Sequence, residues 1–174
     1  MSPKVIFIAG GAASGKSYFA KALSDKEGLV TLDLDDRLQE LIAKDPKHVQ
    51  EIGMELFLEE IREFRYNDLV ARAVVEVKAG RSVALVAPFT THIRDLDLWQ
   101  RYIEPLTQLG VTPTLYWIYI SPELQIERLI ERGELRDLEK IASPATLGEY
   151  VARKAPTPPA VPFIQIDGSK PFTV

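Results

Sequence analysis

The sequence feature that most constrains the fold is a glycine-rich segment near the start of the chain, which reads Gly-Gly-Ala-Ala-Ser-Gly-Lys-Ser at residues 10–17. It matches the pattern G-x-x-x-x-G-K-[ST], in which backbone N–H groups surround phosphate oxygens. An apolar run without polar alternation, residues 5–9, precedes the segment, and apolar residues at helical spacing follow it. We therefore expect the segment to join a buried parallel strand to a helix and to bind phosphate at the helix N-terminus.

The residue types in this segment favour a nucleoside triphosphate with its metal over a phosphate alone. Lys16 is expected to reach the β- and γ-phosphates, and Ser17 to place its hydroxyl on Mg²⁺. The alternative is a glycine-rich turn that matches by chance, and the flanking strand and helix argue against it. The residues expected to contact ATP here are Gly10, Gly11, Ala12, Ala13, Ser14, Gly15, Lys16, Ser17 and Tyr18.

Length and composition indicate one soluble domain over residues 1–174. The net charge of −4 gives no broad electrostatic reason to expect nucleic acid or a membrane as a partner. The chain has no cysteine, which excludes disulfides and thiol catalysis, and its two histidines argue against a histidine-rich metal site. Because residues 1–4 do not resemble a secretion leader, we expect a cytoplasmic protein. The sequence does not indicate an oligomeric state.

A second apolar run ends in a group of aspartates at residues 33, 35 and 36. Side chains alternate along a strand, so Asp33 and Asp35 share one side, which can face the ligand crevice of an α/β sheet. We expect Asp33 to support Mg²⁺ and Asp35 to accept a proton from an attacking hydroxyl, although the two roles could be exchanged. The alternative is a solvated acidic turn that caps the next helix, and this interpretation is favoured for Asp36.

Residues 37–79 have a helical pattern that we expect to break once, near Asp45-Pro46. We assign this region to the binding of the phosphoryl acceptor. Arg37, Arg62 and Arg65 are its candidates for contacting an anionic or hydroxylated acceptor, although arginines on helices are more often exposed.

A third apolar strand, residues 82–87, is followed by Arg94, a further candidate for binding the acceptor. The alternative role for Arg94 is a structural ion pair with Asp95 or Asp97. The strand ends at Ala87-Pro88, where many proteins with this phosphate-binding segment have an aspartate that supports Mg²⁺. Metal support is therefore expected from Ser17 with Asp33 or Asp35, or through phosphates and water.

Three arginines follow the fourth strand, residues 114–120, at successive spacings of four: Arg128, Arg132 and Arg136. If the helix continued, they would form one basic row, which neighbouring glutamates could neutralise. We instead expect Gly133 to end the helix and residues 133–145 to form a lid. Arg132 and Arg136 would then lie over the phosphates and Arg128 nearer the base.

A fifth strand, residues 163–167, is followed by a loop that contains Gly168 and Pro171, and both are expected to line the nucleotide base. Five strands separated by helices predict a three-layer α/β/α sandwich with a parallel sheet in the order 2-3-1-4-5.

With these motifs the chain resembles the small P-loop kinases, a group that includes shikimate kinases, gluconate kinases and polynucleotide-kinase-like proteins of the AAA type. Asp33-Leu34-Asp35 looks like the D-x-D of shikimate kinases, and Asp35-Asp36-Arg37 is similar to a D-D-Y-R segment of polynucleotide kinases. Residues 132–137 are similar to the lid of the broader group. Shikimate kinases carry Gly-Gly-Gly after the third strand, where this chain has Ala87-Pro88-Phe89.

The resemblance implies an ATP- and Mg²⁺-dependent phosphotransferase that acts on a hydroxyl of a small metabolite. Lys16, Arg132 and Arg136 would stabilise the transferred phosphoryl group, and Asp35 would act as the base. Two alternatives stay open: an ATPase that couples hydrolysis to a protein or nucleic-acid partner, and a kinase of nucleic-acid 5′-hydroxyls, against which the acidic composition counts. A GTP-dependent switch is disfavoured because the chain has no N-K-x-D motif.

Overall fold

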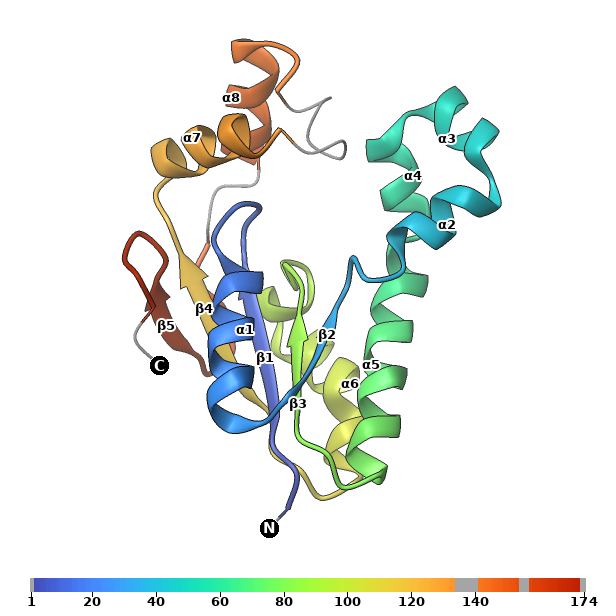
Figure 1. Cartoon of the computed structure of the whole chain (residues 1–174), viewed down its shortest axis with the longest axis vertical. Helices are drawn as coiled ribbons and strands as arrows, with labels where there is room; N and C mark the ends of the chain where they lie inside the picture. The colour runs from blue at the N-terminus through green and yellow to red at the C-terminus, as the bar shows by residue number, and fades with distance from the viewer. Residues whose placement is uncertain (1, 134–140, 154–156, 173–174) are drawn as a thin grey trace.

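The computed structural model describes residues 2–133, 141–153 and 157–172. Its centre is a five-stranded parallel sheet with the order β2-β3-β1-β4-β5 (Figure 1). The strands are β1 (Val5–Gly10), β2 (Val30–Asp33), β3 (Val83–Val86), β4 (Thr114–Tyr119) and β5 (Ile164–Asp167). The predicted α/β architecture and the predicted strand order are confirmed.

Helices cover both faces of this sheet. One face carries α1 (Lys16–Glu27), and the other carries α5 (Arg62–Lys78) and α6 (Leu96–Thr107), which is preceded by a short 3₁₀ helix, η1 (His92–Arg94). Two further groups stand beyond the carboxyl ends of the strands on opposite sides of the molecule (Figure 1). They are α2 (Leu38–Lys44), α3 (Pro46–Ile52) and α4 (Met54–Glu60) on one side, and α7 (Pro122–Arg132) and α8 (Pro144–Arg153) on the other.

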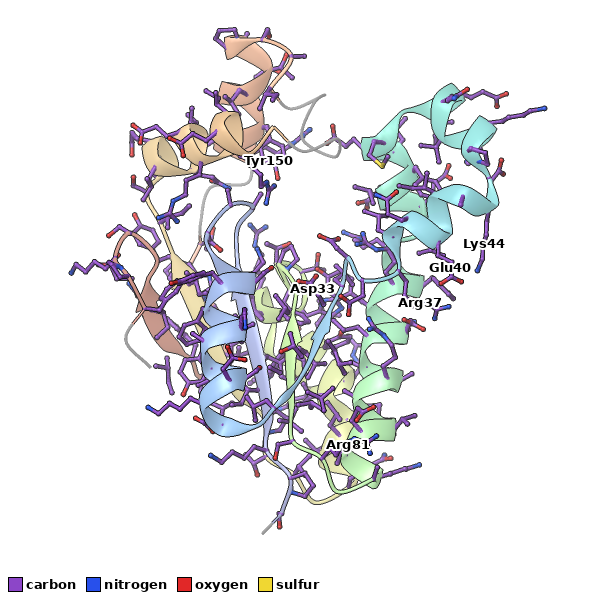
Figure 2. All side chains as sticks on the ribbon, in the orientation of Figure 1. Asp33, Arg37, Glu40, Lys44, Arg81 and Tyr150 are labelled. Atoms are coloured by element: carbon purple, nitrogen blue, oxygen red, sulfur yellow. The ribbon has the colours of Figure 1, made fainter. Side chains whose placement is uncertain are left out.

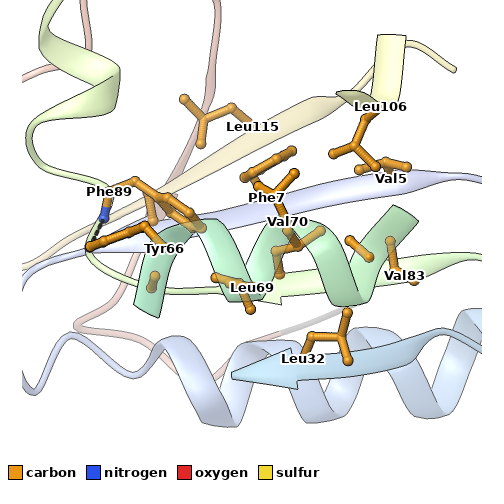
Figure 3. Packing of buried hydrophobic residues seen from close by; sticks show 14 of the residues in the cluster. Val5, Phe7, Leu32, Tyr66, Leu69, Val70, Val83, Phe89, Leu106 and Leu115 are labelled. Atoms are coloured by element: carbon orange, nitrogen blue, oxygen red, sulfur yellow. Dashed lines mark hydrogen bonds between the residues drawn. The ribbon is translucent and has the colours of Figure 1, made fainter. Parts of the chain in front are cut away.

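The central strand β1 shows how the two covered faces arise from the sequence. All six of its residues are buried. Val5 and Phe7 belong to the cluster under α5 and α6, whereas Ile6 and Ile8 belong to the cluster under α1. Side chains alternate between the faces of a strand, so an uninterrupted apolar run supplies both layers of the core. Figure 3 shows Phe7 packed near Leu69, Val70 and Phe89 in the first of these clusters.

The helical region between β2 and β3 differs from the prediction of a single break. The break at Asp45 is present, where the Asp45 side chain accepts a hydrogen bond from the backbone N–H of His48. Two more breaks follow, at Gly53 and at Ile61. Gly53 has a φ of 82°, a backbone conformation that glycine adopts without the steric cost other residues incur. The expectation of one break was wrong because it took account of Pro46 but not of Gly53.

The described part of the chain contains no helix that is both long enough and apolar enough to cross a membrane.

The predicted end of the helix after β4 is confirmed, since α7 ends at Arg132 and Gly133 caps it with a φ of 53°. Most of the lid predicted at 133–145, residues 134–140, lies outside the described residues, and α8 begins at its end.

Candidate functional site

A cleft of about 1300 Å³ opens at the carboxyl ends of β1, β2 and β3. We call one side the loop wall, which consists of residues 11–18, Arg128 and residues 168–172. The opposite side, the helix wall, consists of Glu55, Glu59, Arg62, Arg65 and Tyr66 from α4 and α5. Figure 2 shows Asp33 near the base of the opening between the walls and Tyr150 on the side of α8.

Gly10, which was expected to contact ATP, does not line the cleft but leads directly into the loop wall, with a backbone shape that only glycine permits. A Cβ atom on Gly10 would lie 2.7 Å from the carbonyl oxygen of Ile118 and 2.7 Å from Oγ of Ser14. Gly15 caps α1 with a φ of 94°. The first N–H groups of α1 have no partner within the helix, so they and the positive end of the helix dipole are available to an anion. This geometry fits the phosphate group that the sequence predicts.

Lys16 and Ser17 lie at the start of α1 with their side chains at the cleft. Nζ of Lys16 donates a hydrogen bond of 2.7 Å to the carbonyl oxygen of Gly11. The hydroxyl of Ser17 donates to Oδ2 of Asp33 over 3.2 Å. The structure therefore brings together the two residues predicted to support the metal, although they are 16 positions apart in the chain.

The pair of Ser17 and Asp33 fits Mg²⁺ bound together with a nucleotide. Magnesium is usually held by one or two protein oxygens, with phosphate oxygens and waters as its other ligands. Across the described ranges, no group of three or more acidic, histidine or cysteine side chains could hold a metal by itself. A metal at this position would therefore depend on the phosphates of the nucleotide for most of its remaining ligands.

Asp35 and Arg65 form an ion pair at the junction of the cleft base and the helix wall. Nη2 of Arg65 lies 2.5 Å from Oδ1 of Asp35 and 3.1 Å from the carbonyl oxygen of Leu34. The Arg65 side chain is only 8% exposed, and burial lowers the pKa of its guanidinium. The backbone N–H of Asp35 donates to Oδ1 of Asp33 over 2.9 Å. Both aspartates are thus held in one small network, and Asp35 lines the cleft.

The loop after β5 completes the loop wall from the far end of the chain. A Cβ atom on Gly168 would lie 2.7 Å from the carbonyl oxygen of Ser14 and 2.7 Å from a methyl group of Ile120. Arg128 joins the two loops, because its guanidinium donates to the carbonyl oxygen of Gly168 over 2.8 Å and to that of Ala13 over 3.4 Å. Arg128 therefore contacts backbone on both sides of the position expected for the nucleotide.

The other predicted site residues divide into two groups. Tyr18, Arg132 and Pro171 line the cleft, and the Tyr18 ring lies 5.7 Å from that of Phe172. Arg37 does not line it, because its guanidinium contacts Asp68 over 2.9 Å and Glu40 over 3.3 Å.

Arg94 lies in η1 as an exposed residue and does not line the cleft either. Arg136 lies outside the described residues.

The structure adds cleft residues that the sequence analysis missed. Glu55 and Glu59 come from α4, and Tyr150 and Arg153 from α8. Nη2 of Arg153 lies 2.7 Å from Oε1 of Glu55, so this ion pair connects the two sides of the cleft. The residues are 98 positions apart, and no local pattern predicts such a contact. Proline 144 at the start of α8 could have indicated the helix but not its position over the cleft.

Tyr66 links the helix wall to the buried residues behind it. Its hydroxyl accepts a hydrogen bond of 3.2 Å from the backbone N–H of Phe89, and burial raises its pKa to about 12. The ring of His92 lies 4.6 Å from that of Tyr66 and 4.1 Å from that of Tyr102. Burial, followed by the positive charge of Arg62, lowers the pKa of His92 to about 4. These rings form an aromatic cluster that favours the neutral form of the histidine.

Comparisons with known proteins agree with the fold. A family model described as an AAA domain matches residues 5–157. No curated protein matches the sequence.

Solved structures with the same fold include three named kinases. A sugar kinase from Janibacter sp. HTCC2649 is 18% identical, with 97% of this chain and 87% of that chain covered and a TM-score of 0.65. A gluconokinase from Sinorhizobium meliloti 1021 is 15% identical, with 98% and 85% covered and a TM-score of 0.59. A shikimate kinase from Bacteroides thetaiotaomicron is 16% identical, with 86% and 76% covered and a TM-score of 0.55. At these identities the likeness shows the fold.

Proposed function

We propose that this chain, which belongs to the AAA domain family, is a kinase that transfers the γ-phosphate of ATP to a hydroxyl of a small metabolite in the presence of Mg²⁺. The predicted resemblance to the small P-loop kinases is confirmed by the family match and by the kinases that share the fold. The observation that supports ATP as the donor and a small metabolite as the acceptor is a single cleft with two chemically different walls.

The size of the cleft supports a reaction between two bound molecules. Its volume of about 1300 Å³ exceeds the roughly 300–1000 Å³ that is usual for one drug-sized ligand. The loop wall offers backbone N–H groups and Lys16, which suit a triphosphate. The other side offers the Asp35–Arg65 pair, which suits the hydroxyl groups of an acceptor. An enzyme that only hydrolysed ATP would not need this second polar surface.

The residues have separate roles in this proposal. Lys16 and Arg132 stabilise the charge of the transferred phosphoryl group, a role that the sequence also predicts for Arg136. Ser17 and Asp33 would hold Mg²⁺, which when bound neutralises negative charge on the phosphates. Asp35 accepts the proton of the attacking hydroxyl, and Arg65 orients its carboxylate through Oδ1.

A metabolite screen with a matched pair of variants tests this function. The protein is incubated with ATP, Mg²⁺ and a mixture of hydroxylated metabolites, and mass spectrometry detects any product that has gained one phosphate. Asp35→Asn is expected to lower kcat at least about a hundredfold while leaving ATP affinity unchanged, because general-base catalysis contributes roughly 10²–10⁴ in rate. The control is Asp25→Asn, which changes an exposed aspartate of α1 that pairs with Lys21 outside the cleft.

The same screen separates the alternatives. It includes an oligonucleotide with a free 5′-hydroxyl, whose phosphorylation would favour the nucleic-acid kinase. ATP hydrolysis without any phosphorylated metabolite, raised by an added protein or nucleic acid, would favour the coupled ATPase. If metabolite phosphorylation were found and Asp35→Asn left kcat intact, the role of Asp35 as the base would be wrong.

A further inference from the structure

Arg72 on α5 lies outside the cleft lining but contacts the strand end that carries Asp33. Its Nη2 donates a hydrogen bond of 3.0 Å to the carbonyl oxygen of Asp33. Its Nη1 donates over 3.1 Å to Oδ2 of Asp36, and its Nε lies 3.0 Å from Oδ2 of Asp68. One planar guanidinium thus contacts a backbone carbonyl and two carboxylates, an arrangement that the fork geometry of arginine permits and a lysine ammonium does not reproduce.

Asp36 also contacts the backbone of Asp33, at the N–H group. Oδ2 of Asp36 also accepts a hydrogen bond of 2.9 Å from the backbone N–H of Asp33. Arg72 and Asp36 together therefore engage both polar backbone groups of Asp33. Asp33 is the last residue of β2, and the next backbone N–H, that of Leu34, still donates to Val86 of β3. The two side chains fix the backbone at the point where the β2 strand ends.

The fixed backbone sets the orientation of the Asp33 carboxylate. Its Oδ1 accepts from the N–H of Asp35, and its Oδ2 accepts from the hydroxyl of Ser17. Either contact is lost if the residue turns about its backbone bonds, because hydrogen bonds weaken steeply when their angles depart from linearity. The orientation of the predicted metal-supporting carboxylate therefore depends on residues that line no part of the cleft.

We propose that Arg72 is a positioning residue that sets the orientation of the Asp33 carboxylate for a divalent cation, with Asp36 as its partner. This inference rests on the proposed function, since it assumes a nucleotide and a metal in the cleft. Asp36 was expected to be a solvated turn residue, and its contacts with Arg72 and with the Asp33 backbone assign it a second task. Residues that orient metal ligands in this way typically change metal affinity by roughly ten- to a hundredfold when they are removed.

The experiment measures metal binding directly. Electron paramagnetic resonance follows the binding of Mn²⁺ to the complex of the protein with ADP, and calorimetry gives the ADP affinity with the metal removed by a chelator. Arg72→Gln is expected to weaken Mn²⁺ binding about tenfold or more and to leave metal-free ADP affinity unchanged, because the loop wall is intact. Arg72→Lys keeps the positive charge, and its affinity for Mn²⁺ is expected to lie between those of Arg72→Gln and the wild-type protein.

Two further variants distinguish positioning from a merely structural role. Arg81→Gln removes an arginine that follows α5, pairs with Glu76 and lies far from the cleft (Figure 2), and it is expected to bind Mn²⁺ as the wild-type protein does. In an Asp33→Asn background, Arg72→Gln is expected to add no further loss, because an indirect effect through Asp33 disappears once its carboxylate is removed.

Each result decides the inference. Equal Mn²⁺ affinity in wild type and Arg72→Gln, or losses that add fully in the Asp33→Asn background, would overturn it. A fall in the unfolding temperature of Arg72→Gln and Arg72→Lys without a fall in Mn²⁺ affinity would also overturn it and leave Arg72 a structural residue. If the wild-type protein bound neither ADP nor Mn²⁺ with ADP, the proposed function would fail instead.

Discussion

The two walls of the cleft are built in different ways. The loop wall is mostly one contiguous segment whose shape comes from backbone geometry. A Cβ atom would lie 2.7 Å from a neighbour at Gly168 within the wall and at Gly10 just before it. The ion pair by which the helix wall reaches the base of the cleft, Asp35 with Arg65, joins residues 30 positions apart by side-chain atoms. A site made of backbone is specified by local sequence, whereas a site made of side-chain pairs is specified only by the tertiary structure.

The largest effect is expected when Lys16, which supplies positive charge to the loop wall, is replaced. Lys16→Ala is expected to lower kcat/KM about a thousandfold, because removing one preorganised donor to charge that develops in the transition state typically costs roughly 10²–10³ in rate. Steady-state kinetics measures the loss, and circular dichroism checks the fold. The control, Lys21→Ala, removes an exposed lysine of α1 and should leave kcat/KM unchanged. A loss of less than tenfold for Lys16→Ala would contradict the assignment.

The backbone packing of the loop wall is tested at Gly168. Gly168→Ala is expected to lower the free energy of unfolding by about 2–3 kcal/mol, because the added methyl group overlaps Ser14 and Ile120 in a close-packed position. Denaturant unfolding measures this change, and a loss of nucleotide affinity should accompany it. Gly148→Ala is the control, since the added carbon meets no atom within 4 Å apart from its chain neighbours and the backbone of its own helix. Equal stability of the two variants would contradict this prediction and would mean that the loop after β5 moves to accommodate the methyl group.

The aromatic cluster behind the helix wall makes stability depend on pH. The pKa of His92 is lowered from 6.5 to about 4, so the unfolded chain binds this proton more readily than the folded protein. The contribution of neutral His92 is therefore complete above pH 6.5 and is lost as pH falls toward 4. Allowing for partial solvent screening, we expect a loss of about 2 kcal/mol in unfolding free energy.

Unfolding in denaturant at several pH values checks this prediction. His92→Phe keeps an aromatic ring and should show a smaller decline between pH 6.5 and 4, whereas His48→Asn should not reduce the decline. His48 is a suitable control because hydrogen bonding to Glu60 raises its pKa, which is the opposite direction. Parallel curves for wild type and His92→Phe would contradict the role given to His92.

The ion pair between Glu55 and Arg153 is the smallest expected effect and tests how the walls act together. α8 packs on the loop wall, because Leu147 and Val151 belong to a cluster with Ala12 and Ala13. Both members of the pair are more than half exposed, so the pair is expected to contribute less than about 1 kcal/mol. Glu55→Gln should change the KM for the acceptor less than about fivefold, and the difference should shrink at high salt.

A variant outside the cleft provides the reference for this pair. Glu27→Gln removes the partner of Lys4 and should leave both KM values unchanged. An effect of Glu55→Gln larger than tenfold, or one independent of salt, would mean that Glu55 contacts the acceptor itself.

The difference between the walls also explains which features the sequence predicted. Apolar runs and one phosphate-binding pattern were sufficient for the strand order and for the contact of Ser17 with Asp33, because strand ends in a parallel sheet meet at one edge. The sequence did not distinguish Arg65 from Arg37. Arg65 lies one helical turn before the fully buried Leu69 and therefore faces the core side of α5, whereas Arg37 precedes a short helix and pairs at the surface. That distinction requires the position of the helix on the sheet.

The contact of Arg128 with Gly168 has a consequence for how the protein is made. The phosphate-binding pattern is complete once residue 17 has been synthesised, but Arg128 and Gly168 join it only when the last strand has been added. A polypeptide stopped at residue 157 would contain the whole pattern but would lack residues 168–172 of the loop wall. Nucleotide binding should thus arise late in synthesis, once β5 and the loop that follows it have been added.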